Sequence, residues 1–80
     1  MASKQVLSPL PGTFFRKPAP DQPPYKEAGD AVAVGDVIGL IKVMNSFHEV
    51  KSDVGGTVVK FLLENEAAVM AGQPLLEIED

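Results

Sequence analysis

Two stretches of this 80-residue chain occur twice, and this repeat restricts the possible folds more than any other feature of the sequence. Residues 6–14 (VLSPLPGTF) resemble residues 50–58 (VKSDVGGTV), at an offset of 44. Residues 32–41 (VAVGDVIGLI) resemble residues 69–78 (VMAGQPLLEI), at an offset of 37. The chain therefore has two similar halves, and the difference between the offsets places seven extra residues between Phe14 and Val32.

Glycine and proline are too frequent for long helices. Seven glycines and seven prolines separate short runs rich in β-branched and aromatic residues. These runs predict strands at residues 13–15, 31–34, 37–43, 57–63 and 75–78. Residues 58–70 contain neither Gly nor Pro and are the one alternative helix, but their first half suits a strand better. The repeat then predicts an all-β, quasi-twofold sandwich or flattened barrel, with the connection between the halves opposite the termini.

The composition argues against several classes of function. Eleven acidic and seven basic residues give a net charge of −4, and binding to nucleic acid or an anionic membrane needs a basic surface instead. The absence of cysteine excludes thiol catalysis and disulfides, and one histidine, His48, cannot form a histidine-rich metal site. The sequence contains no secretory signal and no apolar run of membrane-spanning length, so we expect a cytoplasmic protein without metal.

A hairpin is predicted at about residues 40–49, which we call the tip hairpin. Two strand-like runs flank only Met44 and Asn45, and two residues is the length of a tight β-turn. A type I′ turn needs positive φ at both central positions, which Asn tolerates better than Met. A functional site is expected where a residue, here Met44, occupies a backbone position that does not suit its conformational preference. The candidate tip residues are Val43, Met44, Asn45, Ser46 and Phe47.

The extra residues of the first half form a proline-rich stretch, PAPDQPP, at residues 18–24. Four prolines cannot donate hydrogen bonds to a sheet, so a stiff projecting loop is predicted. It is either a tolerated surface insertion or an extension that reaches a partner. We call this loop, at about residues 17–26, the thumb. Its candidate contact residues are Pro18, Pro20, Asp21, Pro23, Pro24 and Tyr25.

Several segments resemble the biotin carboxyl carrier protein of bacterial acetyl-CoA carboxylase. They are residues 8–16 (SPLPGTFFR), 18–21 (PAPD), 29–36 (GDAVAVGD) and 56–58 (GTV), and the likeness extends over about residues 6–79. The resemblance implies a biotinyl/lipoyl attachment domain at residues 6–80, preceded by a tail at residues 1–5. That fold is a flattened barrel-sandwich of two four-stranded antiparallel sheets with quasi-twofold symmetry. In this family the proline-rich loop is a thumb that lies beside the biotin.

The attachment motif of that family does not match. The family reads Glu-Ala-Met-Lys-Met at the tip and carries biotin on the lysine, whereas residues 42–46 here read KVMNS. Asn45 therefore occupies the lysine position, and an amide nitrogen is not the nucleophile that attachment needs. Lys42 lies three residues earlier and is interpreted as an ordinary solvated strand lysine, as are Lys51 and Lys60. We expect neither biotin nor lipoate on this chain.

Three hypotheses follow. In the first, the chain is a non-catalytic, non-biotinylated carrier-like subunit that docks with protein subunits of a carboxylase-like or acyl-transfer assembly. The contact surface would consist of Met44, Phe47 and the thumb, with Tyr25 as an anchor. If the chain is complete, only a few residues precede the domain, and this hypothesis then favours docking over a mobile arm. In the second, it is a genuine biotin carrier of acetyl-CoA carboxylase, in fatty-acid synthesis, altered at position 45. In the third, it binds a small ligand non-covalently in a cleft between thumb and tip.

Overall fold

The computed structural model describes residues 3–80 as β-strands joined by turns and loops, without a helix. Accordingly, no helix in that part of the chain is long and apolar enough to cross a membrane. The all-β prediction is confirmed. The strands are β1 (Ser3–Leu7), β2 (Gly12–Phe15), β3 (Ala31–Val32), β4 (Val37–Val43), β5 (Ser46–Lys51), β6 (Gly56–Phe61), β7 (Ala67–Val69) and β8 (Pro74–Glu79).

The strands form two four-stranded sheets, with the order β1-β8-β6-β3 in one and β5-β4-β2-β7 in the other. Every paired set of strands is antiparallel. The repeat relates β1–β4 to β5–β8, and exchanging each strand for its equivalent converts the first order into the second. The predicted pair of quasi-twofold, four-stranded antiparallel sheets is therefore confirmed.

Equivalent turns in the two halves are built around equivalent buried serines. Ser8 and Ser52 are each 2% exposed, and each hydroxyl donates to the main-chain carbonyl two residues ahead, at 2.6 and 2.5 Å. Their main-chain N–H groups donate to the carbonyls of Gln73 and Asp36, both at 2.8 Å. A buried hydroxyl needs such a partner, so the repeated serine marks a repeated structural requirement.

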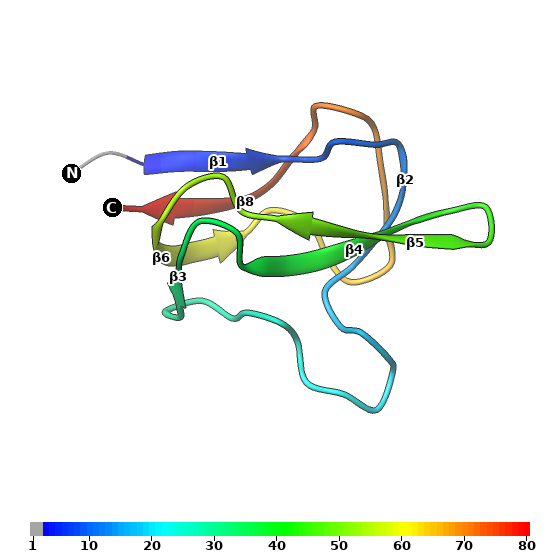
Figure 1. The fold of residues 1–80 in the computed structure, drawn as a ribbon, viewed down its shortest axis with the longest axis horizontal. Coiled ribbons are helices and arrows are strands. Elements are labelled where there is room, and N and C mark those ends of the chain that lie inside the picture. The colour runs from blue at the N-terminus through cyan, green and yellow to red at the C-terminus, as the bar shows by residue number, and fades with distance from the viewer. Residues whose placement is uncertain (1–2) are drawn as a thin grey trace.

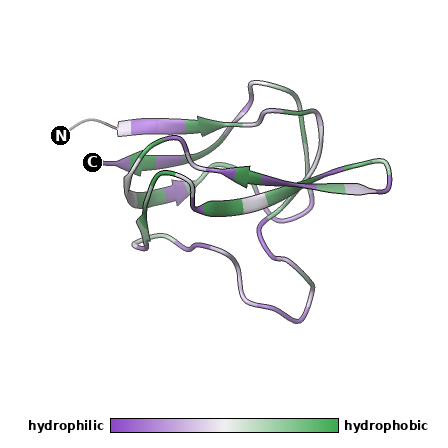
Figure 2. Cartoon of the chain, in the orientation of Figure 1, coloured by the Kyte–Doolittle hydropathy of each residue, from purple (hydrophilic) through white to green (hydrophobic). Residues whose placement is uncertain are grey.

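The core lies between the two sheets and draws on both halves. Phe14, Ile38 and Ile41 are fully buried in it, although Ile38 and Ile41 are three residues apart on β4. Strict strand alternation would place those two on opposite faces, but a register shift between Val37 and Gly39 brings both inward. In Figure 2, apolar colouring concentrates on the strands, whereas the thumb is mostly pale or purple.

The tip hairpin projects at the opposite end of the domain from the two termini, as predicted (Figure 1). It consists of β4, β5 and the turn between them. Residues 16–30 form the long loop between β2 and β3 that contains the thumb, and only residues 62–66 connect the equivalent strands of the second half. The extra length of the first half thus lies on one side of the tip hairpin.

Two features of the secondary structure differ from the prediction or refine it. The expected tail at residues 1–5 is too long, because β1 begins at Ser3 and residues 3–6 pair with β8. This edge strand turns only Val6 to the core, so it has no apolar alternation to reveal it in the sequence. Residues 58–70 form parts of two strands, β6 and β7, rather than a helix, which confirms the preference for strand.

Candidate functional site at the tip hairpin and thumb

The turn of the tip hairpin is a two-residue connection between β4 and β5. Val43 and Ser46 are the last paired residues, which leaves Met44 and Asn45 in the turn. Met44 has φ 56° and is 90% exposed, while Asn45, also exposed, does not have a positive φ. A positive φ at the first central residue alone is the pattern of a type II′ turn. The alternative turn type considered for Met44 therefore applies, and Met44 adopts a conformation that costs a non-glycine residue energy.

The tip residues do not all face the same way. Val43 was a candidate tip residue, but it is half-buried and packs against the core rather than presenting its side chain beside Met44 and Phe47. The reason is strand alternation, because Ile41 and Val43 share the inner face while Lys42 faces outward. Lys42 lies directly opposite Phe47 of β5, and Phe47 is 55% exposed. The exposed apolar part of the tip is therefore Met44 and Phe47.

A cavity of about 460 Å³ lies between the outer face of this sheet, the start of the thumb and the loop at residues 62–66. The rings of Phe15 and Phe47 pack against each other there, with centroids 5.8 Å apart and planes tilted by 60°. The ammonium group of Lys42 lies 5.6 Å from the centre of the Phe47 ring. Lys42 is thus part of a cavity wall, and its interpretation as an ordinary solvated strand lysine was incomplete. The lining residues are Phe15, Lys17, Pro18, Ala19, Pro20, Lys42, Phe47, Asn65 and Glu66.

Only part of the predicted thumb set reaches this cavity. Pro18 and Pro20 line it, while Asp21 and Pro23 are exposed elsewhere on the loop. Tyr25 and the preceding Pro24 are half-buried and are not among the lining residues. Tyr25 therefore does not line the cavity with Phe47, and its role as an anchor for a partner stays a prediction.

Sequence reasoning missed Phe15, Lys17, Asn65 and Glu66 as site residues. Phe15 carried a usable signal, because it follows Phe14 directly and consecutive strand residues face opposite sides. Asn65 and Glu66 lie in the second half of the chain, and no local pattern relates them to the thumb. Among residues 3–80 the non-glycine residues with positive φ are Met44 at the tip and Glu66 in the cavity wall. Backbone strain tends to concentrate at functional sites, which supports treating tip and cavity as one site.

The start of the thumb is held by hydrogen bonds around Arg16. Its main-chain N–H donates to Oδ1 of Asn65 at 2.8 Å, and its carbonyl accepts from the N–H of Tyr25 at 3.0 Å. The guanidinium group lies 3.9 Å from the centre of the Phe61 ring, which is the geometry of a cation–π contact. These contacts fix the position at which the thumb leaves β2.

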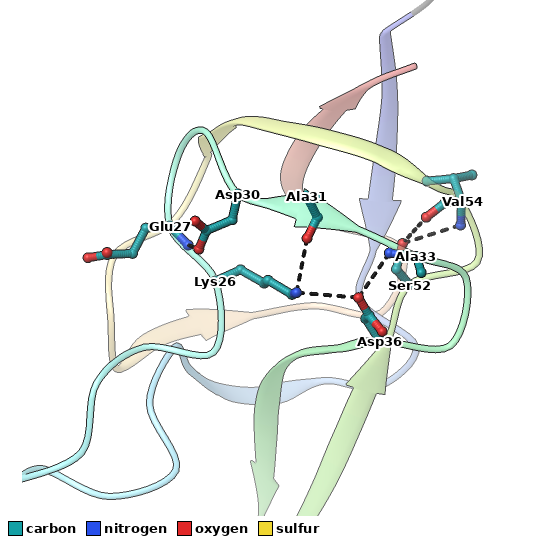
Figure 3. Close-up of polar contacts among 8 residues, drawn as sticks. All are labelled: Lys26, Glu27, Asp30, Ala31, Ala33, Asp36, Ser52 and Val54. Atoms are coloured by element: carbon teal, nitrogen blue, oxygen red, sulfur yellow. Dashed lines mark hydrogen bonds and ion pairs between the residues drawn. The ribbon is translucent and has the colours of Figure 1, made fainter.

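The end of the thumb is anchored by Lys26 (Figure 3). Its ammonium group donates to the carbonyl of Ala31 at 3.0 Å and forms an ion pair with Asp36 at 3.3 Å. The pKa of Asp36 is lowered, first because the N–H of Ala33 donates to its carboxylate and second because Lys26 also donates to it. The thumb is therefore tied to the domain at both ends.

The residues at the tip do not fit covalent attachment of biotin. Asn45 and Met44 are the two central residues, and neither has an amine that could attack an activated acyl group. Lys42 is the nearest lysine on β4, but it projects from the sheet beside Phe47 and lies outside the turn. Residues 3–80 also contain no group of three or more acidic or histidine side chains that could hold a metal ion.

A quasi-twofold sandwich of two four-stranded sheets with a projecting two-residue hairpin defines the class of biotinyl/lipoyl attachment domains. The sequence model of the family described as "Biotin-requiring enzyme" matches residues 4–78, and the chain belongs to this family. The resemblance inferred from the sequence is thereby confirmed.

Individual relatives agree with this assignment. The chain is 37% identical over 75 residues to the biotin carboxyl carrier protein of acetyl-CoA carboxylase from Nostoc sp., which covers 94% of this chain and 41% of the relative. It is 35% identical over 74 residues to the protein of the same name from Haemophilus influenzae, covering 92% and 48%. The urea carboxylase structure of Kluyveromyces lactis superposes with a TM-score of 0.78 at 26% identity, covering 99% of this chain and 6% of that one. The chain thus spans less than half the length of these relatives.

Proposed function

We propose that this chain is a carrier-type domain that is not biotinylated and that serves as a non-catalytic docking or structural module of a carboxylase-type or acyl-transfer assembly. Its similarity to biotin carboxyl carrier proteins supports the kind of assembly. The observation that carries the absence of biotin is Asn45, which holds the second central position of the tip turn.

The chemistry of Asn45 is the reason for this proposal. Transfer of an activated biotinyl group needs a nucleophile with a free lone pair, and the lone pair of an amide nitrogen is delocalised into its carbonyl. The flanking residues also differ from the Glu-Ala-Met-Lys-Met pattern, since Lys42, Val43 and Ser46 replace three of its members. A single accidental exchange at position 45 would leave those flanks intact, so the site as a whole has diverged.

Docking is supported by the apolar surface that remains at the tip. Met44 is 90% exposed and Phe47 is 55% exposed, although polar side chains would cost less hydration energy at both positions. Exposed apolar residues that lie close together commonly mark contact surfaces. A protein subunit of the assembly that covers these two side chains would remove the cost.

The attachment half of the proposal is tested by co-expression with an active biotin ligase in excess biotin, followed by intact-mass measurement. We expect the wild-type chain to keep its unmodified mass and the Asn45→Lys variant to be partly biotinylated. The variant is the positive control, because it restores the amine on the same turn. A biotinyl group on the wild-type chain, mapped to Lys42 or to any other lysine, would overturn the proposal.

The docking half is tested by co-purification with biotin carboxylase and carboxyltransferase subunits from the same organism. We expect Met44→Asp to weaken the association, because a carboxylate at the tip must be desolvated on binding. Met70→Asp is the matched control, since Met70 is 70% exposed on the turn between β7 and β8. Equal retention of both variants, or no retention of the wild type, would show that the tip is not a docking surface.

A further inference from the structure

We infer that the cavity beside the thumb is a non-covalent binding site for a small carboxylate with a flat, apolar ring. This goes beyond the docking role, because binding a free carboxylate requires neither a partner subunit nor a modified tip. The inference rests on the walls of the cavity, the state of its two lysines and the polar groups opposite them.

The walls suit a flat apolar body. Phe15 and Phe47 form one side, with ring centroids 5.8 Å apart, and Pro18 and Pro20 of the thumb also line the space. Phe47 is 55% exposed, so its ring has surface left for a further stacking partner. The cavity of about 460 Å³ is of the size that holds small ligands.

The charge of the cavity selects an anion. Lys4, Lys26 and Lys60 form ion pairs with carboxylates, whereas Lys17, Lys42 and Lys51 have no ion-pair partner within residues 3–80. Lys17 and Lys42 both line the cavity, in a protein with a net charge of −4. The carboxylate of Glu66 also lines it but forms no ion pair with either lysine, so the two lysines leave the cavity with an excess of positive charge. A ligand carboxylate would supply the missing partner, and the aromatic wall would lower the local dielectric around the pair.

Polar residues from the second half of the chain form another wall of the cavity beside the thumb. Oδ1 of Asn65 accepts the main-chain N–H of Arg16 at 2.8 Å, which leaves the Asn65 side-chain N–H₂ group without a partner within residues 3–80. The loop is held in place because the N–H of Glu66 donates to the carbonyl of Phe14 at 2.7 Å, with Glu66 at φ 67°. Asn65 can therefore donate to a ligand oxygen from a fixed position.

A second cavity, of about 330 Å³, lies between β1 and β5 and serves as a comparison. No aromatic residue lines it, and its one lysine, Lys51, shares the space with Glu49 and Asp53. It therefore lacks the stacking surface of the cavity beside the thumb, and its two carboxylates outnumber its one lysine.

The test is a titration of the ¹⁵N-labelled chain, followed by amide chemical shifts, with three probes of the same shape and different charge: benzoate, benzamide and benzylamine. We expect saturable shifts with benzoate at Lys17, Lys42, Phe47 and Asn65. Benzamide should bind at least about fivefold more weakly than benzoate, because the lysines form ion pairs only with the carboxylate. Benzylamine should bind more weakly still. Benzoate affinity should also fall between low and high salt.

Two pairs of substitutions separate a local site from a general effect of charge. Lys17→Gln with Lys42→Gln should weaken benzoate about five- to tenfold and leave benzamide unchanged. Lys51→Gln with Lys60→Gln removes the same charge elsewhere and should change neither probe. Equal affinities for benzoate and benzamide, shifts centred on the cavity beside Lys51, no saturable shifts, or equal effects of the two pairs would each overturn the inference. The spectra also report whether each variant is folded.

Discussion

The conformation of Met44 makes a prediction in an unusual direction, that replacing it by glycine stabilises the protein. The left-handed backbone region costs an L-residue about 1–2 kcal/mol, and glycine does not have this cost. Glycine in turn lowers the free energy of unfolding by about 0.5–1 kcal/mol, because it gives the unfolded chain greater conformational freedom. The Met44 side chain is 90% exposed, so its removal forfeits little packing. We therefore expect Met44→Gly to raise the free energy of unfolding by about 0.5–1 kcal/mol, or the melting temperature by about 2–8 °C.

The neighbouring turn residue provides the control. Asn45 does not have a positive φ, so Asn45→Gly relieves no strain and should lower stability by about 0.5–1 kcal/mol. Both variants are to be compared with the wild type by calorimetry and by circular dichroism under the same conditions. The two changes should shift the melting temperature in opposite directions. If Met44→Gly lowers it as much as Asn45→Gly does, the strain at Met44 is not real and the reasoning is refuted.

Three further predictions concern packing, pH and the thumb. Gly39→Ala should lower the free energy of unfolding in urea by about 1–3 kcal/mol, because the added methyl group would lie 2.6 Å from the Phe14 ring. Gly55→Ala should be tolerated, because the nearest atom to its methyl group would be 3.5 Å away. Similar urea midpoints for the two variants would contradict this prediction. The pKa of Asp36 is lowered on folding, so its carboxylate contributes stability at neutral pH that is lost as the pH falls below about 4. Asp36→Asn should therefore flatten the acid part of the plot of unfolding free energy against pH. An unchanged acid limb would show that the Asp36 contacts do not form in solution. Deleting residues 18–24 should leave a folded domain that melts cooperatively, at a cost of about 1 kcal/mol or less, and aggregation of the deletion variant would mean that the thumb is part of the core.

The sequence alone determined the architecture, because its internal repeat predicts two structurally equivalent halves. The offsets of 44 and 37 residues related the halves before any strand was placed, and the two sheets have equivalent strand orders. The repeat also aligns Ser8 with Ser52, and in the structure each of them buries a hydroxyl that donates to a nearby carbonyl. The two-residue connection at Met44 and Asn45 was also readable, because hairpin length depends only on neighbouring residues.

The tertiary structure decided which side chains meet. Strand faces alternate with a period of two, and a register shift of one residue changes the facing of every residue beyond it. The shift between Val37 and Gly39 could not be read from composition, and the sequence did not show that Val43 packs against the core. The cavity joins Phe15, Lys42 and Asn65 from different strands and loops. Their proximity depends on how the sheets and the thumb pack, which is a long-range property that no local pattern in the chain contains.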